Sequence, residues 1–120
     1  MELIDSIHDL KALQISAEFR HWITPAEPEH RTLEKLYTSL QDDIDNLVEC
    51  SLGSGLIHPG AFSSRRIDIN LDQDIATQIA NCLSLLRRTA SVLSKDEEIQ
   101  DLVYDLMNLL NKINYLLSLS

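Results

Sequence analysis

Hydrophobic residues recur at helical spacing along four stretches of the chain, residues 3–22, 29–51, 72–93 and 96–118. In the second stretch the apolar positions are Leu33, Leu36, Tyr37, Leu40, Ile44, Leu47 and Val48. Residues three and four apart share one face of a helix, so each stretch predicts an amphipathic helix with its apolar face in the core. No stretch shows the sustained alternation of a half-buried strand. The pattern therefore predicts an all-α protein.

The segments between these stretches predict how the helices are connected. Pro25 and Pro28 in "TPAEPEH" interrupt the first and second helices. The second helix is expected to end at "GSG" with Gly53 as its left-handed cap, and Ser94 with Glu97 forms a capping-box signature for the fourth. Two short connections and one long one favour an antiparallel four-helix bundle with a crossover between the second and third helices. An up-down-up-down bundle with a long middle loop is the alternative.

Composition narrows the class of protein. A chain of 120 residues with 44% hydrophobic content is expected to fold as a single domain. Its net charge of −9, with no basic residue among the first ten, argues against a nucleic-acid surface and against a signal peptide. No apolar run approaches the roughly 20 residues that cross a bilayer. Cys50 and Cys82 lie within apolar patterns, which predicts buried free thiols and a reducing, cytoplasmic location.

One stretch, "EHRTLEKLYTSLQDDIDNLVEC", places a histidine and three carboxylates in a single sector of a helix. Measured from His30, Glu34 lies at about 40°, Asp45 at about 60° and Glu49 at about 100°. Glu34 and Asp45 are about 16 Å apart along the axis, so the four side chains form two half-sites that cannot share one ion within a chain. Two such helices packed antiparallel about a two-fold axis would bring opposite half-sites together. A solvated flank of an amphipathic helix explains the same residues without a metal.

His21 and Trp22 stand at the end of the first predicted helix. The short proline turn is expected to bring His21 close to His30, and Trp22 could then shield a site from water. A lone histidine on an apolar face is more often a core residue than a ligand. The residues alone therefore leave both interpretations open.

This arrangement of "HW" followed by "H…E……D…E" resembles the Dps-type mini-ferritins of the ferritin-like superfamily, which are four-helix proteins that form dodecameric shells. The resemblance covers residues 10–55 and 94–118. It implies an intersubunit site to which one chain contributes two histidines and an acid, with a tryptophan nearby, and its two-fold mate contributes two acids. The corresponding residues here are His21, His30, Glu34 and Trp22 from the first chain, and Asp45 and Glu49 from the mate.

The resemblance also implies a function. Such a protein would be a ferroxidase, an oxidoreductase that binds two iron ions or other divalent metals per site and oxidises Fe(II), with peroxide as the usual oxidant. Iron storage and protection from oxidative damage would follow, and Trp22 would quench stray oxidants. The chain is shorter than the family's, its middle connection is too short for the family's lateral helix, and it lacks the basic tail used to bind DNA. The alternative function is a metal-free helical bundle acting as an interaction or shell-forming module.

Overall fold

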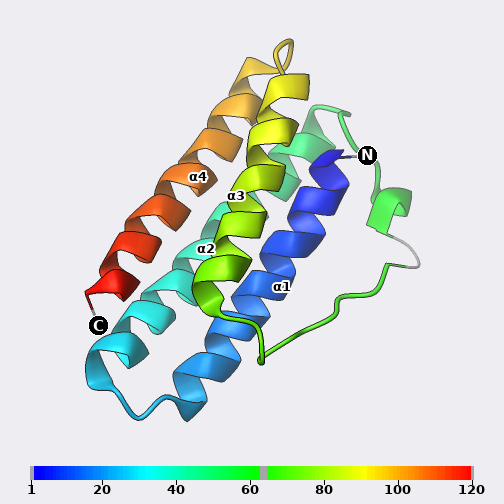
Figure 1. Cartoon of the computed structure of the whole chain (residues 1–120). Coiled ribbons are helices and arrows are strands. Elements are labelled where there is room, and N and C mark those ends of the chain that lie inside the picture. Colours follow the sequence, from blue (N-terminus) through cyan, green and yellow to red (C-terminus); the bar gives the residue numbers. More distant parts are fainter. Residues whose placement is uncertain (1, 63–64, 120) are drawn as a thin grey trace.

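The computed structural model describes residues 2–62 and 65–119, which form a bundle of four long α-helices (Figure 1). The helices are α1 (Glu2–Ile23), α2 (Glu27–Gly53), α3 (Ile75–Val92) and α4 (Glu97–Ser118), with the short 3-10 helix η1 (Pro59–Phe62) between α2 and α3. The described residues contain no strand, which confirms the all-α prediction. None of the described helices is long and apolar enough to cross a membrane.

Each helix packs against two others, so that α1 contacts α2 and α3, and α4 contacts the same two helices. A hydrogen bond of 2.7 Å between the hydroxyls of Ser6 and Thr89 joins the start of α1 to the end of α3. The Ser16 hydroxyl donates to Gln78 Oε1 over 2.8 Å near the opposite ends of the same two helices. Since α1 is antiparallel to both α2 and α3, those two helices run in the same direction.

The connection between α2 and α3 passes along α1 (Figure 1). Arg65 donates to the Asp5 carboxylate over 2.5 Å near the start of α1. Arg20, in the last turns of α1, donates to the backbone carbonyl of Gln73 just before α3 begins. The connection therefore returns the chain from one end of the bundle to the other.

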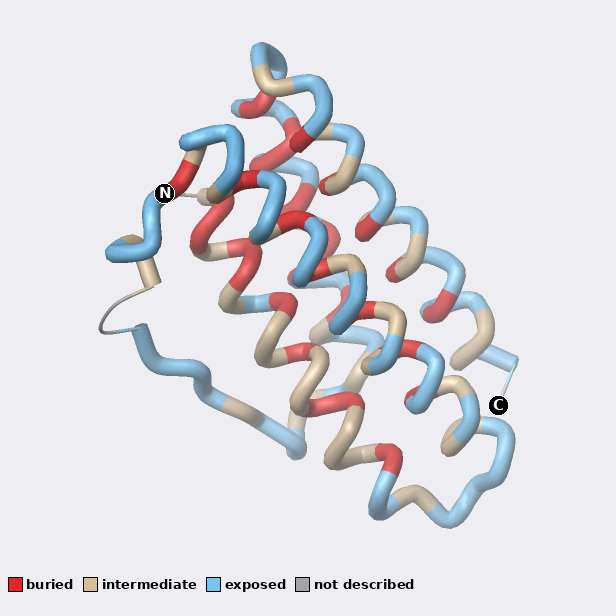
Figure 2. Tube along the Cα trace, turned by 180° about the vertical axis from the view of Figure 1, so that it is seen from behind, coloured by how far each residue is buried: buried red, intermediate tan, exposed pale blue. Residues whose placement is uncertain are grey.

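The predicted apolar stripes face the interior, where buried positions recur along every helix (Figure 2). On α2 the side chains of Leu33, Leu36, Leu40 and Leu47 are fully buried, whereas Tyr37 and Val48 are partly buried at the edge of the core. Burying a leucine side chain contributes about 1.5–3 kcal/mol relative to leaving it in water. The periodic stripes thus supply the main stabilisation of the bundle.

Several helix ends differ from the predictions. Helix α2 begins two residues earlier than expected because Pro28 fits its first turn, where a missing N–H breaks no helical hydrogen bond. The predicted left-handed cap at Gly53 is wrong: Gly53 is helical, and the positive φ of 79° falls on Gly55. The Ser94 capping box is also wrong, because Asp96 is the N-cap of α4 and caps it without a side-chain hydrogen bond. Helix α3 begins three residues later than predicted.

The two cysteines have different environments. Cys82 is buried on α3, as predicted, and burial raises the pKa of its thiol to about 12. Cys50 is exposed on α2, so the prediction that it is buried is wrong. The next residue, Ser51, takes the buried position, which puts Cys50 outside the apolar stripe.

Candidate metal centre

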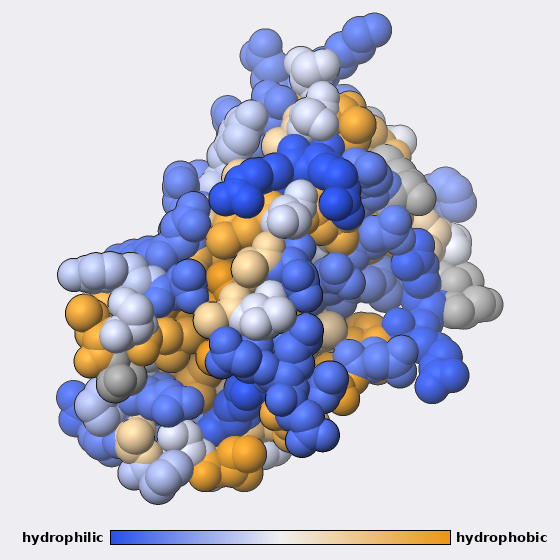
Figure 3. All heavy atoms as spheres, in the orientation of Figure 1, coloured by the Kyte–Doolittle hydropathy of each residue, from blue (hydrophilic) through white to orange (hydrophobic). Residues whose placement is uncertain are grey.

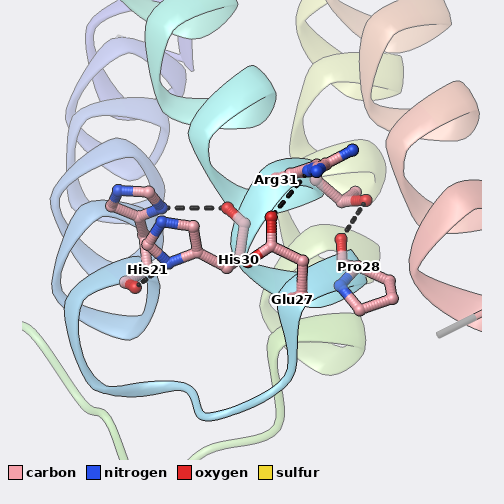
Figure 4. A network of polar contacts seen from close by, with 6 residues as sticks. His21, Glu27, Pro28, His30 and Arg31 are labelled. Carbon is pink, nitrogen blue, oxygen red and sulfur yellow. Dashed lines mark hydrogen bonds and ion pairs between the residues drawn. The ribbon is translucent and has the colours of Figure 1, made fainter.

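The short turn between α1 and α2 brings two histidines into direct contact (Figure 4). The Nδ1 atom of His21 bonds to the backbone carbonyl of His30 over 2.9 Å, and the Nδ1 atom of His30 bonds to the carbonyl of His21 over 2.8 Å. The two rings stack with their centroids 3.7 Å apart and their planes inclined by 25°. This reciprocal pair is called the histidine clasp below. It confirms the prediction that the proline turn brings His21 close to His30.

The clasp determines which nitrogen of each ring can bind a metal. A carbonyl oxygen only accepts hydrogen bonds, so Nδ1 must carry the proton in both His21 and His30. In the neutral imidazole this leaves a lone pair on Nε2. Metal-binding histidines in proteins are commonly oriented in this way, with the second ring nitrogen donating to a carbonyl. Both rings of the histidine clasp are therefore in the tautomer whose Nε2 atom can bind a metal.

Glu34 completes a group of three ligands. One ligand atom from each of His21, His30 and Glu34 lies within 4.8 Å of the other two. Donors at about 2.1 Å from one tetrahedral ion are about 3.4 Å apart, so separations of up to 4.8 Å must shorten by as much as about 1.4 Å. Glu34 is exposed and makes no side-chain hydrogen bond within the described residues, so its carboxylate can supply this movement. Three protein ligands would leave the remaining coordination positions open.

The surroundings of the clasp include residues that the sequence did not single out as part of a site. His21 is only 8% exposed, and the ring of Tyr37 meets its ring edge-on with centroids 5.3 Å apart. Burial, and then the nearby Glu34 and Glu18 carboxylates, raise the pKa of Tyr37, so its hydroxyl stays protonated. The position of Tyr37, seven residues after His30 and hence on the same side of α2, was the available signal.

The expected shielding by Trp22 does not occur within one chain. Trp22 is 65% exposed, and its ring stacks on Phe19 with centroids 5.4 Å apart. Successive residues on a helix are turned by about 100°, so Trp22 points outward where His21 points towards α2. The indole is therefore available to something outside this chain.

Asp45 and Glu49 lie at the other end of the outer surface formed by α1 and α2, called the α1–α2 face below. Both are exposed, and both line a cavity of about 320 Å³ together with His8 and Lys11. The remaining lining residues are apolar: Ile7, Ile44, Val48, Phe62 and Ile67. The structure thus brings Asp45 and Glu49 together but keeps them away from the histidine clasp, in accord with two half-sites per chain. The sequence did not predict that His8 and Lys11 lie beside Asp45 and Glu49, because they belong to a different helix, α1.

The sequence profile of a protein family of unknown function (DUF5856) matches residues 21–117, and the chain belongs to that family. The matched region contains both half-sites, beginning at His21 and including Asp45 and Glu49. Comparison with functionally described proteins and with solved structures returned no significant match.

Proposed function

We propose that the protein binds Fe(II) as a substrate at a composite site between two copies and oxidises it. The observation that carries this proposal is the histidine clasp, which leaves both Nε2 atoms free to bind a metal in two residues that form a ligand group with Glu34. A pair of histidines fixed in the metal-binding tautomer, with a carboxylate one turn away, suits a transition metal better than a magnesium or calcium ion. The site is open towards the α1–α2 face, where a second chain can add ligands.

The spacing of the four residues on α2 supports a two-fold arrangement. The midpoint between His30 and Glu49 falls between Ser39 and Leu40, and the midpoint between Glu34 and Asp45 falls at the same place. A two-fold axis passing there would set His30 opposite Glu49 of the second copy and Glu34 opposite its Asp45. Because such an interface is isologous, it would create two equivalent composite sites.

The charges on the exposed side of α2 favour the same arrangement. In the first half of the helix the exposed Arg31 and Lys35 stand beside the exposed Glu27 and Glu34, and Arg31 pairs with Glu27 over 2.7 Å. In the second half the exposed charged residues, Asp42, Asp45 and Glu49, are all acidic. Antiparallel packing of two copies brings Arg31 and Lys35 of each copy towards the acidic half of α2 in the other. Opposite charges across an interface guide association and select the register.

The composite site has donors suited to both oxidation states of iron. Imidazole nitrogens from the histidine clasp bind Fe(II), and the harder carboxylate oxygens of Glu34, Asp45 and Glu49 stabilise Fe(III). Two Fe(II) ions lose one electron each, and one hydrogen peroxide takes both electrons with two protons to give two waters. The biological result would be iron storage and protection from oxidative damage. A closed shell would extend this function, but the chemistry requires only the two-fold dimer.

Mixing two inactive variants gives a sharp test of a composite site. One variant carries Glu34→Ala and His30→Ala, and the other carries Asp45→Ala and Glu49→Ala. Each alone should oxidise Fe(II) with peroxide no faster than buffer. In an equimolar mixture half of the dimers are mixed, and each mixed dimer has one intact site of two, so about a quarter of wild-type activity should return.

Recovery in the mixture would exclude a site built within one chain. A mixture as inactive as its components, with wild-type protein active, would refute the composite site. The control is Asp101→Ala, which removes an equally exposed helical aspartate on α4 and should leave oxidation unchanged. If the wild type itself oxidises Fe(II) no faster than buffer, the ferroxidase proposal fails and the metal-free interaction module is favoured.

A further inference from the structure

We propose that Trp22 of one copy is seated in the apolar cavity of the second copy, beside that copy's Asp45 and Glu49. The proposal rests on the two-fold arrangement of the proposed function and names the contact that holds the two chains together. It assigns a role to an exposed aromatic residue and to the apolar walls of the cavity that Asp45 and Glu49 also line.

Trp22 has the character of an interface anchor. Its side chain is 65% exposed, and the neighbouring Ile23 is 70% exposed. The stack on Phe19 already limits the motion of the indole, so little further ordering is needed when it binds. A large, exposed and pre-oriented tryptophan is the kind of residue that dominates binding energy in protein interfaces.

The cavity offers complementary chemistry. Its volume is about 320 Å³, and Ile7, Ile44 and Val48 from the two helices form its apolar walls with Phe62 and Ile67 from the connection. The carboxylates of Asp45 and Glu49 also line it and would accept the indole N–H, which usually finds a partner when buried.

The two-fold arrangement brings the indole to this cavity. Trp22 follows His21, which contacts His30, and the axis that sets His30 opposite Glu49 of the second copy brings Trp22 to the level of that copy's cavity. The orientation agrees as well, because Lys11, which lines the cavity, lies within about 20° of Trp22 around the axis of α1. Trp22 and the apolar cavity therefore lie on the same side of the molecule, at opposite ends of the α1–α2 face.

A second copy is favoured over another occupant because the α1–α2 face is self-complementary, with the exposed Trp22 at one end and the apolar cavity at the other. Lys35 and Arg31, the second of which pairs with Glu27, lie in the half of α2 nearer to Trp22, whereas Asp45 and Glu49 lie at the cavity. An isologous dimer satisfies both ends of the α1–α2 face at once and makes the Trp22 contact twice.

Because the chain contains a single tryptophan, its fluorescence reports directly on this contact. The measurement uses the full chain in chelator, so that metal bridges cannot cause association, over a dilution series followed by fluorescence and analytical ultracentrifugation. As the dimer forms, Trp22 emission should move to shorter wavelength and its quenching by acrylamide should fall. Trp22→Ala should raise the dimer dissociation constant at least about 30-fold, as expected for an anchor residue. The control Tyr115→Ala removes an aromatic residue that is 63% exposed on α4 and should leave the dissociation constant unchanged.

A second variant tests the cavity separately from the tryptophan. Ile67→Asp changes a cavity residue outside the helices, so the bundle should still fold, and Trp22 should keep the emission of an exposed indole at every concentration. Dimers that form without a change in Trp22 emission, with Trp22→Ala binding within about threefold of wild type, would overturn the docking proposal. If activity nevertheless recovers when the two inactive variants are mixed, the composite metal site is supported although Trp22 does not dock in the cavity. A chain that stays monomeric at all concentrations also overturns the docking proposal.

Discussion

The histidine clasp predicts that stability and metal binding can be separated by substitution. His30→Ala removes the hydrogen bond from His30 to the His21 carbonyl and the stacked ring, while His21 still donates to the unchanged backbone carbonyl of residue 30. A partly buried hydrogen bond contributes about 1 kcal/mol and a stacked ring pair about 1 kcal/mol more. The free energy of unfolding in chelator should therefore fall by about 2 kcal/mol, a Tm loss of about 8 °C for a chain of this size.

Glu34→Gln is the matched comparison, because Glu34 is exposed and should change stability in chelator by less than about 0.5 kcal/mol. With Co(II) as a redox-stable probe at about 100 times its dissociation constant, binding should stabilise the wild type by about 2.7 kcal/mol. Both variants should lose most of this increment. Thermal unfolding by circular dichroism, with and without Co(II), measures the stability in chelator and the Co(II) increment of each protein. A His30→Ala protein as stable as wild type in chelator would refute the structural role of the clasp, and a Co(II) increment retained in Glu34→Gln would refute its role as a ligand.

Two further predictions concern titrating groups elsewhere in the bundle. Burial, and then the charges of Asp105 and Asp42, raise the pKa of the Asp43 carboxyl above its ordinary value of 3.8. The folded chain therefore holds the carboxyl proton of Asp43 more tightly than the unfolded chain does, and the protein loses stability as the pH rises through the raised pKa. Asp43→Asn should therefore raise the free energy of unfolding at pH 7 by less than about 1 kcal/mol and give no gain at pH 3; an equal gain at both pH values would contradict this cause. Cys82, with its buried thiol and a pKa of about 12, should resist Ellman's reagent in the native protein while the exposed Cys50 reacts. One thiol per chain should react in buffer and two in urea, whereas two fast thiols in buffer would contradict the burial of Cys82.

Much of the fold could be predicted from the sequence, because an apolar stripe on a helix is a local property of the chain. Leu33, Leu40 and Leu47 recur at intervals of seven, and such spacing buries one face of a helix against any partner. Helix ends were harder to predict, because they depend on which of several candidate capping residues the adjoining segments of the chain permit. Gly55 takes the left-handed turn in place of Gly53, and the next helix begins after Asp96 without the Ser94 cap.

The candidate site divides in the same way. The sequence by itself determined that His30 lies beside Glu34 and Asp45 beside Glu49 on α2, because residues four apart on a helix are neighbours whatever the rest of the fold does. Only the tertiary structure decided that His21 and His30 hold each other's backbone carbonyls, since this depends on the angle at which α1 and α2 meet. The cavity that joins His8 and Lys11 to Asp45 and Glu49 was likewise a result of packing. Contacts between helices depend on their separation and crossing angle, which side chains throughout the core set together and no local stretch of sequence encodes.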